Sequence, residues 1–184
     1  MKKRKLNRLQ GYDYSRDGYY FVTVCTYNRF EWFGKIENKE MQSNKYAGVI
    51  WACWHDLPNH YQNVRLDEFV VMPNHIHGII IIDNVGNGFK PFPTIGRSVN
   101  APKNHGLSEI MRGFKTFSSR KINEMTINDG KFRWQKSFHD RIIRGEQSLD
   151  RIRAYIHNNP LQWPDDAENP AGNNRGRSLQ LGDL

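Results

Sequence analysis

The chain has 184 residues, with 38% hydrophobic and 25% charged residues, which predicts one soluble globular domain and excludes a disordered chain. Its formal net charge is +8 and its sequence pI is about 9.6, a balance that favours polyanionic partners such as nucleic acid. No stretch approaches the roughly 20 apolar residues that cross a bilayer, and no apolar segment follows the basic N-terminus. We therefore expect a cytoplasmic protein, associated with the nucleoid if it binds DNA.

The N-terminal segment is basic, with no acidic residue among residues 1–8. Arg4 and Lys5 lie in the run MKKRKLNR. Such a run either contacts phosphates or forms a solvated tail, and the sequence does not distinguish these alternatives.

The first predicted elements are a strand and a helix. Residues 19–26 are β-branched and aromatic, which is typical of a strand, and residues 29–36 suit a short pairing partner or a loop. Apolar residues recur at helical spacing over residues 40–57 and predict a helix with one buried face. Pro58 is expected to end this helix.

Two strands and a long loop come next. Residues 66–72 and 75–82 are apolar and predict one or two strands, with Pro73 producing a bend between them. Residues 83–106 are rich in Gly and Pro and lack periodicity, which predicts a long loop.

The last third of the chain predicts a helix, a strand and a second helix. The helix is marked by apolar residues over 107–117, and residues 131–143 suit a strand followed by an irregular segment. The final helix runs from an N-cap at Ser148 to a stop at Pro160.

This order of elements predicts an α+β fold, a ferredoxin-like antiparallel sheet with helices packed on it. We expect residues 1–165 to form one domain with a basic N-terminal arm, and residues 166–184 to form a flexible tail. Cys25 and Cys53 lie in apolar segments without metal-binding spacing, so two buried, reduced thiols are expected rather than a disulfide or a zinc site.

His75 and His77 are an unusual pair in the apolar stretch FVVMPNHIHGIIII. Residues i and i+2 of a strand point to the same face, so both imidazoles can approach one metal ion. A rigid strand would hold them in place. Buried, hydrogen-bonded histidines without a metal are the alternative.

Tyr155 and Asn159 form a second candidate group in YIHNNP of the last helix. They are four residues apart and therefore share a helical face. Leu149, Ile152 and Ile156 form the stripe expected to pack on the sheet, with Tyr155 at its edge. Both polar side chains can then face the histidines. The alternative is a Tyr at the core boundary and an Asn that prepares the helix stop.

Together, the segments MPNHIHGIII, WQKSFHDRIIR and YIHNNP resemble those of the HUH single-tyrosine (Y1) transposases. The similarity spans roughly residues 10–165 and is greatest to the REP-associated tyrosine transposase branch of the IS200-like superfamily. It implies a ferredoxin-like fold and a transposase that nicks and rejoins single-stranded DNA through a 5′-phosphotyrosine. His75 and His77 match the two metal-binding histidines, Tyr155 the nucleophile, and Asn159 the third ligand, which is Gln in related insertion-sequence enzymes.

The resemblance also implies the cofactor and the partners. Family members use Mg²⁺ or Mn²⁺, and this branch recognises short REP-like DNA hairpins as a monomer, whereas insertion-sequence relatives form homodimers that exchange the tyrosine helix. Side chains suited to phosphate contacts are Arg4, Lys5, Arg112, Lys115, His139, Arg141 and Arg144.

Three other functions fit parts of the pattern. A cupin carries a His-x-His strand pair, but the helical periods argue against its nearly all-β fold. A structural zinc site needs four ligands. A domesticated, non-catalytic protein that binds DNA hairpins would keep the fold without the chemistry, and the complete set of His75, His77, Tyr155 and Asn159 argues against that loss.

Overall fold

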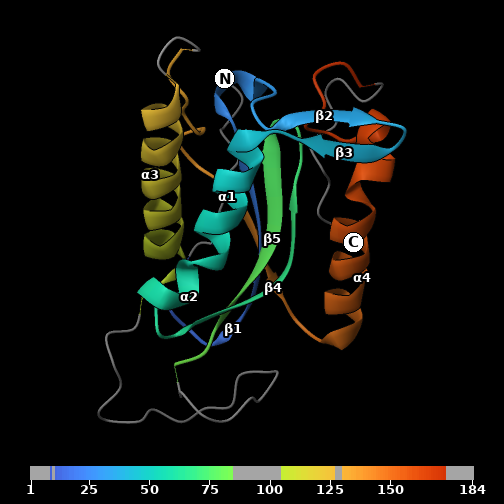
Figure 1. Ribbon diagram of the computed structural model, residues 1–184. Helices are drawn as coiled ribbons and strands as arrows, with labels where there is room; N and C mark the ends of the chain where they lie inside the picture. Colours follow the sequence, from blue (N-terminus) through green and yellow to red (C-terminus); the bar gives the residue numbers. More distant parts are fainter. Residues whose placement is uncertain (1–8, 10, 85–104, 127–129, 173–184) are drawn as a thin grey trace, which may run out of the picture.

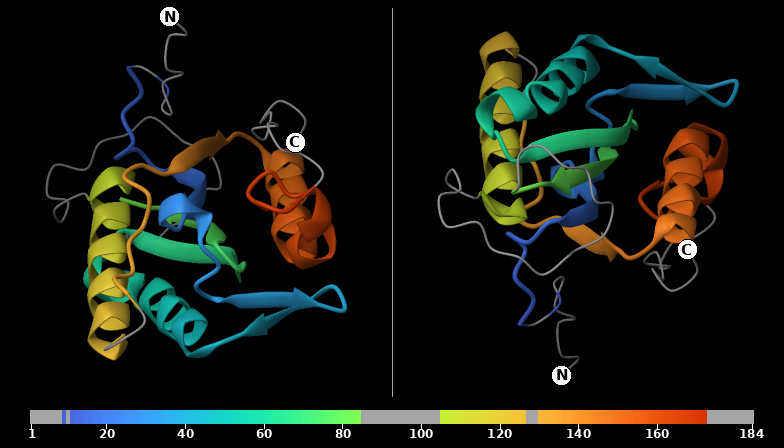
Figure 2. Two further views of the ribbon diagram at one scale, coloured as in Figure 1. Left: turned by 90° about the horizontal axis from the view of Figure 1, so that it is seen from above. Right: turned by 90° about the horizontal axis from the view of Figure 1, so that it is seen from below.

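The computed structural model describes residues 9, 11–84, 105–126 and 130–172 (Figure 1). Its centre is a four-stranded antiparallel sheet with the order β4-β5-β1-β6. Helices cover both faces of this sheet, which confirms the α+β, ferredoxin-like arrangement (Figure 2). The strands are β1 (Gly18–Cys25), β4 (Val64–Val71), β5 (His75–Ile82) and β6 (His139–Ile143).

One face of the sheet is covered by α1 (Lys45–His55), the short α2 (Leu57–His60) and α3 (Leu107–Met125). Trp54 of α1 and Phe114 of α3 are buried against each other, with ring centroids 5.6 Å apart. Of the helices described, none combines the length and the hydropathy needed to cross a bilayer.

The opposite face is covered by α4 (Glu146–Asn158), which continues as a 3₁₀ helix, η2 (Asn159–Asp165). The expected stripe of Leu149, Ile152 and Ile156 is buried there against strands β1 and β5. This placement fixes which side of α4 faces the sheet.

Strand β5 lies between the two cores, and every one of its residues is buried. Its side chains alternate between the faces, as a strand requires. Ile76, Ile80 and Ile82 pack on the α1/α3 side, whereas Ile79 and Ile81 pack on the α4 side. The apolar run after the histidines is therefore explained by burial on both faces.

The structure corrects the expected helix over residues 40–57. A hairpin of β2 (Gly34–Glu37) and β3 (Glu40–Ser43) precedes the helix. Asn44 then caps α1, because its Oδ1 accepts hydrogen bonds from the backbone N–H groups of Tyr46 and Ala47. Pro58 does not end α1 but lies in the first turn of α2. A proline is tolerated there because the backbone N–H groups of the first turn have no partner within the helix.

Residues 131–143 have the reverse of the expected order. The irregular part comes first, tied to β1 by one isolated bridge between Thr26 and Trp134, and the strand β6 follows. Ser148 is not the N-cap of α4, which begins after Gly145 without a side-chain cap. Pro160 lies inside η2 rather than beyond the helical segment. Most of the expected loop over residues 83–106 lies outside the described residues.

The expectation for the cysteines is confirmed. Cys25 and Cys53 are buried and free, as the sequence predicted. Phe117, the last residue of the apolar pattern over residues 107–117, is in contrast 42% exposed on α3.

Candidate functional site

His75 and His77 are completely buried and point to the α4 side of the sheet, where His77 contacts Tyr155 and His75 lies against Trp163. Their Nε2 atoms are 3.0 Å apart, so the two imidazoles converge on one point. The alternation of β5 places them on the same face as Ile79 and Ile81, which pack under α4.

The hydrogen bond of Asn74 fixes the tautomer of His75. Asn74 Nδ2 donates to the backbone carbonyls of Arg29 and Glu168, so its Oδ1 must accept the bond from His75 Nδ1, 2.8 Å away. His75 Nδ1 therefore carries the proton, and its Nε2 lone pair faces His77. This is the arrangement that a metal-binding histidine requires.

His77 is held in a similar way, with its Nδ1 2.8 Å from Thr23 Oγ1 on β1. Burial lowers the pKa of His75 to about 3, and the positive charge of Arg29 adds to this shift. Burial and the neighbouring His75 lower the pKa of His77 well below its usual range. Both imidazoles are therefore neutral at pH 7, the state in which they bind metals.

Tyr155 of α4 lies directly over this pair. Its Oη is 3.2 Å from His77 Nε2, and Phe21 packs against both rings. Burial raises the pKa of the Tyr155 phenol above its usual value, and the negative charge of Asp166 adds to the rise. The phenol is consequently protonated at neutral pH and needs activation before it can act as a nucleophile.

Asn159 completes the group predicted from the sequence and is fully buried. Its Nδ2 donates to Asp166 Oδ2 at 3.1 Å, which leaves Oδ1 with no hydrogen-bond partner among the described residues. A buried amide oxygen without a donor is unfavourable unless something else binds it. A cation would satisfy it.

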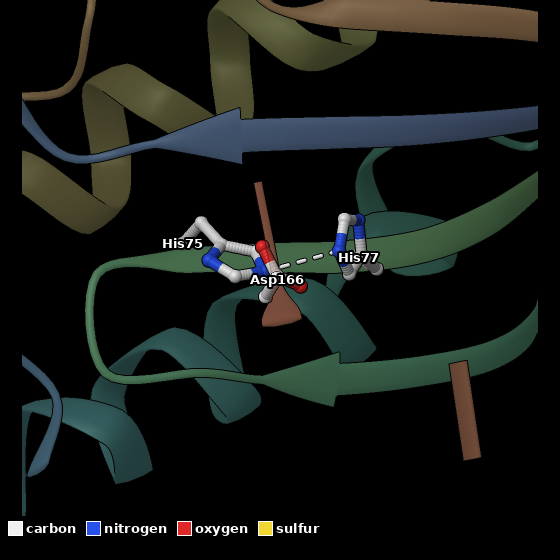
Figure 3. A group of neighbouring side chains, drawn as sticks. All are labelled: His75, His77 and Asp166. Atoms are coloured by element: carbon white, nitrogen blue, oxygen red, sulfur yellow. Dashed lines mark hydrogen bonds between the residues drawn. The ribbon is translucent and has the colours of Figure 1, made fainter. Parts of the chain in front are cut away.

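Asp166 was not predicted from the sequence, yet its carboxylate lies beside both imidazoles (Figure 3). The ligand atoms of His75, His77 and Asp166 all lie within 4.8 Å of one another, and Asp166 is 7% exposed. No ion pair joins Asp166 to a Lys or Arg of the described ranges, so its buried charge lacks a counter-ion. The group of two neutral imidazoles and one carboxylate could bind a divalent metal ion.

The segment after η2 holds Asp166 in place, although the sequence suggested a flexible tail from residue 166. Glu168 is buried and pairs with Arg29 at 2.8 Å, and its backbone N–H donates to Asp166 Oδ1 at 2.6 Å. Trp163 stacks near His75, with ring centroids 6.0 Å apart. Residues 166–172 thus belong to the folded domain, and the expected boundary at residue 165 falls inside it.

The residues that we expect to contact DNA lie in separate regions of the structure. Arg4 and Lys5 lie outside the described residues. Arg112 and Lys115 lie on α3, on the other face of the sheet from Tyr155. The Lys115 ammonium donates to two backbone carbonyls, at 2.5 and 2.9 Å, which gives it a structural role.

The other three candidates lie on or beside the edge strand β6. His139 is exposed and pairs in register with Thr23, the residue that holds His77. Arg141 and Arg144 line a pocket of about 460 Å³ together with Ser148 and Arg151 of α4. Arg151 is a cation that the sequence reading missed, although it lies four residues before Tyr155 on the same helical face.

Comparison of the sequence with known families agrees with this fold and with this cluster of side chains. Residues 97–159 match the family described as "Transposase IS200 like". An uncharacterized protein of Haemophilus influenzae is 38% identical over 169 residues, which cover 89% of this chain and 91% of the relative. The chain belongs to the IS200-like transposase family.

A solved structure of a REP-associated tyrosine transposase bound to a REP hairpin has the same fold. It superposes with a TM-score of 0.55 at 16% identity, and the match covers 84% of this chain and 73% of that chain. The sheet with helices on both faces is therefore shared with a protein whose structure contains hairpin DNA.

Proposed function

We propose that this transposase cuts and rejoins single-stranded DNA, with Tyr155 as the nucleophile and His75, His77 and Asn159 as metal ligands. The observation that carries the proposal is the 3.2 Å distance between Tyr155 Oη and His77 Nε2 inside one buried cluster. A buried phenol beside two neutral imidazoles and an amide oxygen without a donor matches the needs of metal-assisted phosphoryl transfer.

The chemistry follows from the phenol. Tyr155 Oη attacks phosphorus, its proton leaves to solvent, and the bond from phosphorus to the 3′ oxygen breaks. That oxygen takes up a proton, which leaves a free 3′-OH and a 5′-phosphotyrosine. Attack by another 3′-OH on the phosphotyrosine reverses the step and joins two strands, so no external energy source is required.

The donor set fits a divalent cation, either Mg²⁺ or Mn²⁺. His75 and His77 would contribute their Nε2 atoms, Asn159 its Oδ1 and Asp166 a carboxylate oxygen, a set that mixes nitrogen with the oxygen ligands that such ions favour. When bound, the ion would neutralise and orient the scissile phosphate and lower the pKa of the phenol.

The substrate we propose is a DNA hairpin of the REP type with unpaired nucleotides beside it. The net charge of +8 and the solved relative bound to a REP hairpin support a hairpin partner. Arg141 of β6, Arg144 just after it and Arg151 of α4 line one pocket, and we propose that they contact phosphates of this DNA.

A cleavage assay tests this proposal. The protein is incubated with an end-labelled, single-stranded hairpin DNA and Mg²⁺ or Mn²⁺, and the products are separated under denaturing conditions. A covalent protein–DNA adduct is expected for the native chain and is not expected for the Tyr155→Phe variant. EDTA should abolish the adduct in the native chain as well.

Binding of the same hairpin provides the control. Tyr155→Phe should still bind it, since the substitution removes one hydroxyl and keeps the packing of the ring. An adduct that persists in Tyr155→Phe would place the nucleophile elsewhere. DNA binding without any adduct in the native chain would favour a non-catalytic hairpin-binding protein.

A further inference from the structure

Glu168 is a buried carboxylate that is not among the proposed metal ligands. It lies two residues after Asp166, in the non-repetitive segment that follows η2. A buried glutamate is unfavourable unless its charge is paired and hydrogen-bonded. Glu168 meets this condition, because Arg29 Nη2 lies 2.8 Å from its Oε2 and the thiol of Cys25 donates to the same oxygen at 3.2 Å. Residues near the end of β1 therefore fix a side chain close to the C-terminus.

The backbone of Glu168 contacts two residues of the candidate site. Its N–H donates to Asp166 Oδ1 at 2.6 Å, and its carbonyl accepts a hydrogen bond from Asn74 Nδ2 at 2.7 Å. The other oxygen of Asp166 accepts from Asn159, so both carboxylate oxygens are oriented. Asn74 in turn fixes Nδ1 of His75. One residue thus orients a carboxylate and, through Asn74, an imidazole of the proposed ligand set.

Arg29 supports the same contacts from a turn after β1. Its Nη1 donates to the Ala167 carbonyl at 3.0 Å, and its own carbonyl accepts a second hydrogen bond from Asn74 Nδ2 at 3.2 Å. Arg29 has a φ angle of 56°, in the left-handed region that residues other than glycine rarely adopt. Such a conformation persists only where the surroundings hold it. The turn is therefore held in a shape that brings both the guanidinium and the carbonyl of Arg29 to this segment.

The charges around Glu168 leave Asp166 available for a cation. The guanidinium of Arg29 pairs with Glu168, whereas Asp166 belongs to no ion pair within the described part of the chain. The unpaired negative charge of this segment is consequently that of Asp166, which lies beside His75 and His77. This division separates a carboxylate that holds the segment from a carboxylate that can bind an ion.

We propose that Glu168 is a positioning residue of the metal site. Its contact with Arg29 seats the segment that carries Asp166 and places the carbonyl that orients Asn74. The inference rests on the proposed function, because it concerns the metal ligands assigned there. Glu168 acts through its hydrogen bonds rather than through its charge, since Arg29 already neutralises that charge. Supporting contacts of this kind typically change metal affinity by about 10–100-fold.

Binding of Mn²⁺ to the full chain without DNA tests this role. Electron paramagnetic resonance of free Mn²⁺ gives the dissociation constant, and thermal unfolding of the metal-free protein gives the stability separately. Glu168→Ala should weaken Mn²⁺ binding at least about tenfold. Glu168→Gln keeps an oxygen that accepts from Arg29 and should stay within about threefold of the native affinity. Glu31→Ala removes an exposed carboxylate just after the same turn and should leave the affinity unchanged.

Arg29→Ala breaks the same contact from its half-exposed end and keeps the test decisive should Glu168→Ala not fold. It should also weaken Mn²⁺ binding at least about tenfold. The double variant Arg29→Ala/Glu168→Ala should lose little more than the weaker-binding single variant, because both substitutions remove one shared contact.

The possible results separate the two proposals. Native affinity in Glu168→Ala and Arg29→Ala, with lower stability alone, would overturn the positioning role. An equal loss in Glu168→Gln and Glu168→Ala would overturn it as well, since the charge of Glu168 would then attract the ion. Either result leaves the proposed function intact if the native chain binds Mn²⁺ and forms the DNA adduct. A native chain that binds no Mn²⁺ contradicts the metal site of the proposed function itself.

Discussion

Arg153 of α4 forms two hydrogen bonds with the carboxylate of Asp67 on β4. Arg153 Nε lies 2.9 Å from Oδ1 and Nη2 lies 2.6 Å from Oδ2. The two residues are 86 positions apart in the chain, and Arg153 lies two residues before Tyr155. This pair of hydrogen bonds, the Arg153–Asp67 fork, therefore fixes the helix that carries the proposed nucleophile against the edge of the sheet.

The first prediction concerns this fork. Asp67→Asn should lower the free energy of unfolding by about 1 kcal/mol, because the pair is charge-assisted but Arg153 is partly exposed. Asp150→Asn is the matched control, since Asp150 is 71% exposed and makes one longer contact to the same Arg153. Urea unfolding at pH 7 measures both, and an equal effect of the two substitutions would contradict the assigned role.

The pH dependence of this contribution has a definite sign. Burial raises the pKa of Asp67, but the hydrogen bonds from Arg153 and from the backbone of Glu68 outweigh burial and hold the pKa below its usual value. The contribution is therefore present above the carboxyl pKa of the unfolded chain, about 3.9, and is lost as the pH falls through the lower folded value. The stability difference between the native chain and Asp67→Asn should narrow in acid.

The second prediction concerns Asp166 as a metal ligand. Asp166→Asn should abolish most of the rise in melting temperature that Mn²⁺ or Mg²⁺ gives the native chain, because it removes the anionic oxygen. Without metal the variant should be at least as stable as the native chain, since it removes a buried charge that has no described counter-ion.

Asp165→Asn provides the control for Asp166. Asp165 is the neighbouring, exposed acid, so the change in net charge is the same while the site is untouched. Its metal-dependent shift in melting temperature should equal that of the native chain. A purely structural role for Asp166 would give the opposite pattern, a less stable metal-free variant with an unchanged shift.

The third prediction concerns Thr23. Thr23→Val removes the hydroxyl that lies 2.8 Å from His77 Nδ1 but keeps the shape of the side chain. Loss of such a supporting hydrogen bond typically weakens metal binding about 10–100-fold. Thr23→Ser keeps the hydroxyl and should retain most of the affinity. Titration calorimetry with Mn²⁺ measures both variants, and equal affinity in Thr23→Val would show that the hydroxyl does not orient the ring.

The fourth prediction concerns Gly78, which follows His77 on β5. A Cβ added there would lie 2.4 Å from Trp54 Cζ2 and 2.8 Å from its Cη2, in the tightly packed core under α1. Gly78→Ala should therefore destabilise the fold by about 1–3 kcal/mol. Gly48→Ala, where the added Cβ meets nothing within 4 Å on the surface of α1, should instead be neutral or stabilising. Thermal unfolding of the two variants compares them directly.

The histidine pair and the tyrosine helix could be predicted because each depends on a local period. The two-residue period of a strand places His75 and His77 on one face of the sheet. The apolar stripe of α4 packs on the sheet and so turns Tyr155 toward it. The strand order and the approach of α4 to β5 involve residues far apart in the chain, which no local period predicts. The expectation that Tyr155 lies near the histidines therefore depended on the family resemblance.

Asp166 and Glu168 could not be predicted in the same way. They lie in a non-repetitive turn after η2, and their positions depend on partners from other parts of the chain, such as Arg29 and Asn74. The polar composition of this segment is also typical of a frayed tail, which is why the boundary was expected at residue 165. The hairpin before α1 was missed because its strands are short and mostly exposed.

The residues of the proposed site are synthesised in a fixed order, because they are far apart in the sequence. A ribosome makes the strands that hold His75 and His77 well before it reaches the nucleophile at residue 155 and the carboxylate at residue 166. A product of interrupted translation that ends before α4 would carry two of the four proposed metal ligands, His75 and His77, and would lack Tyr155. Under the proposed mechanism, such fragments would not cut DNA.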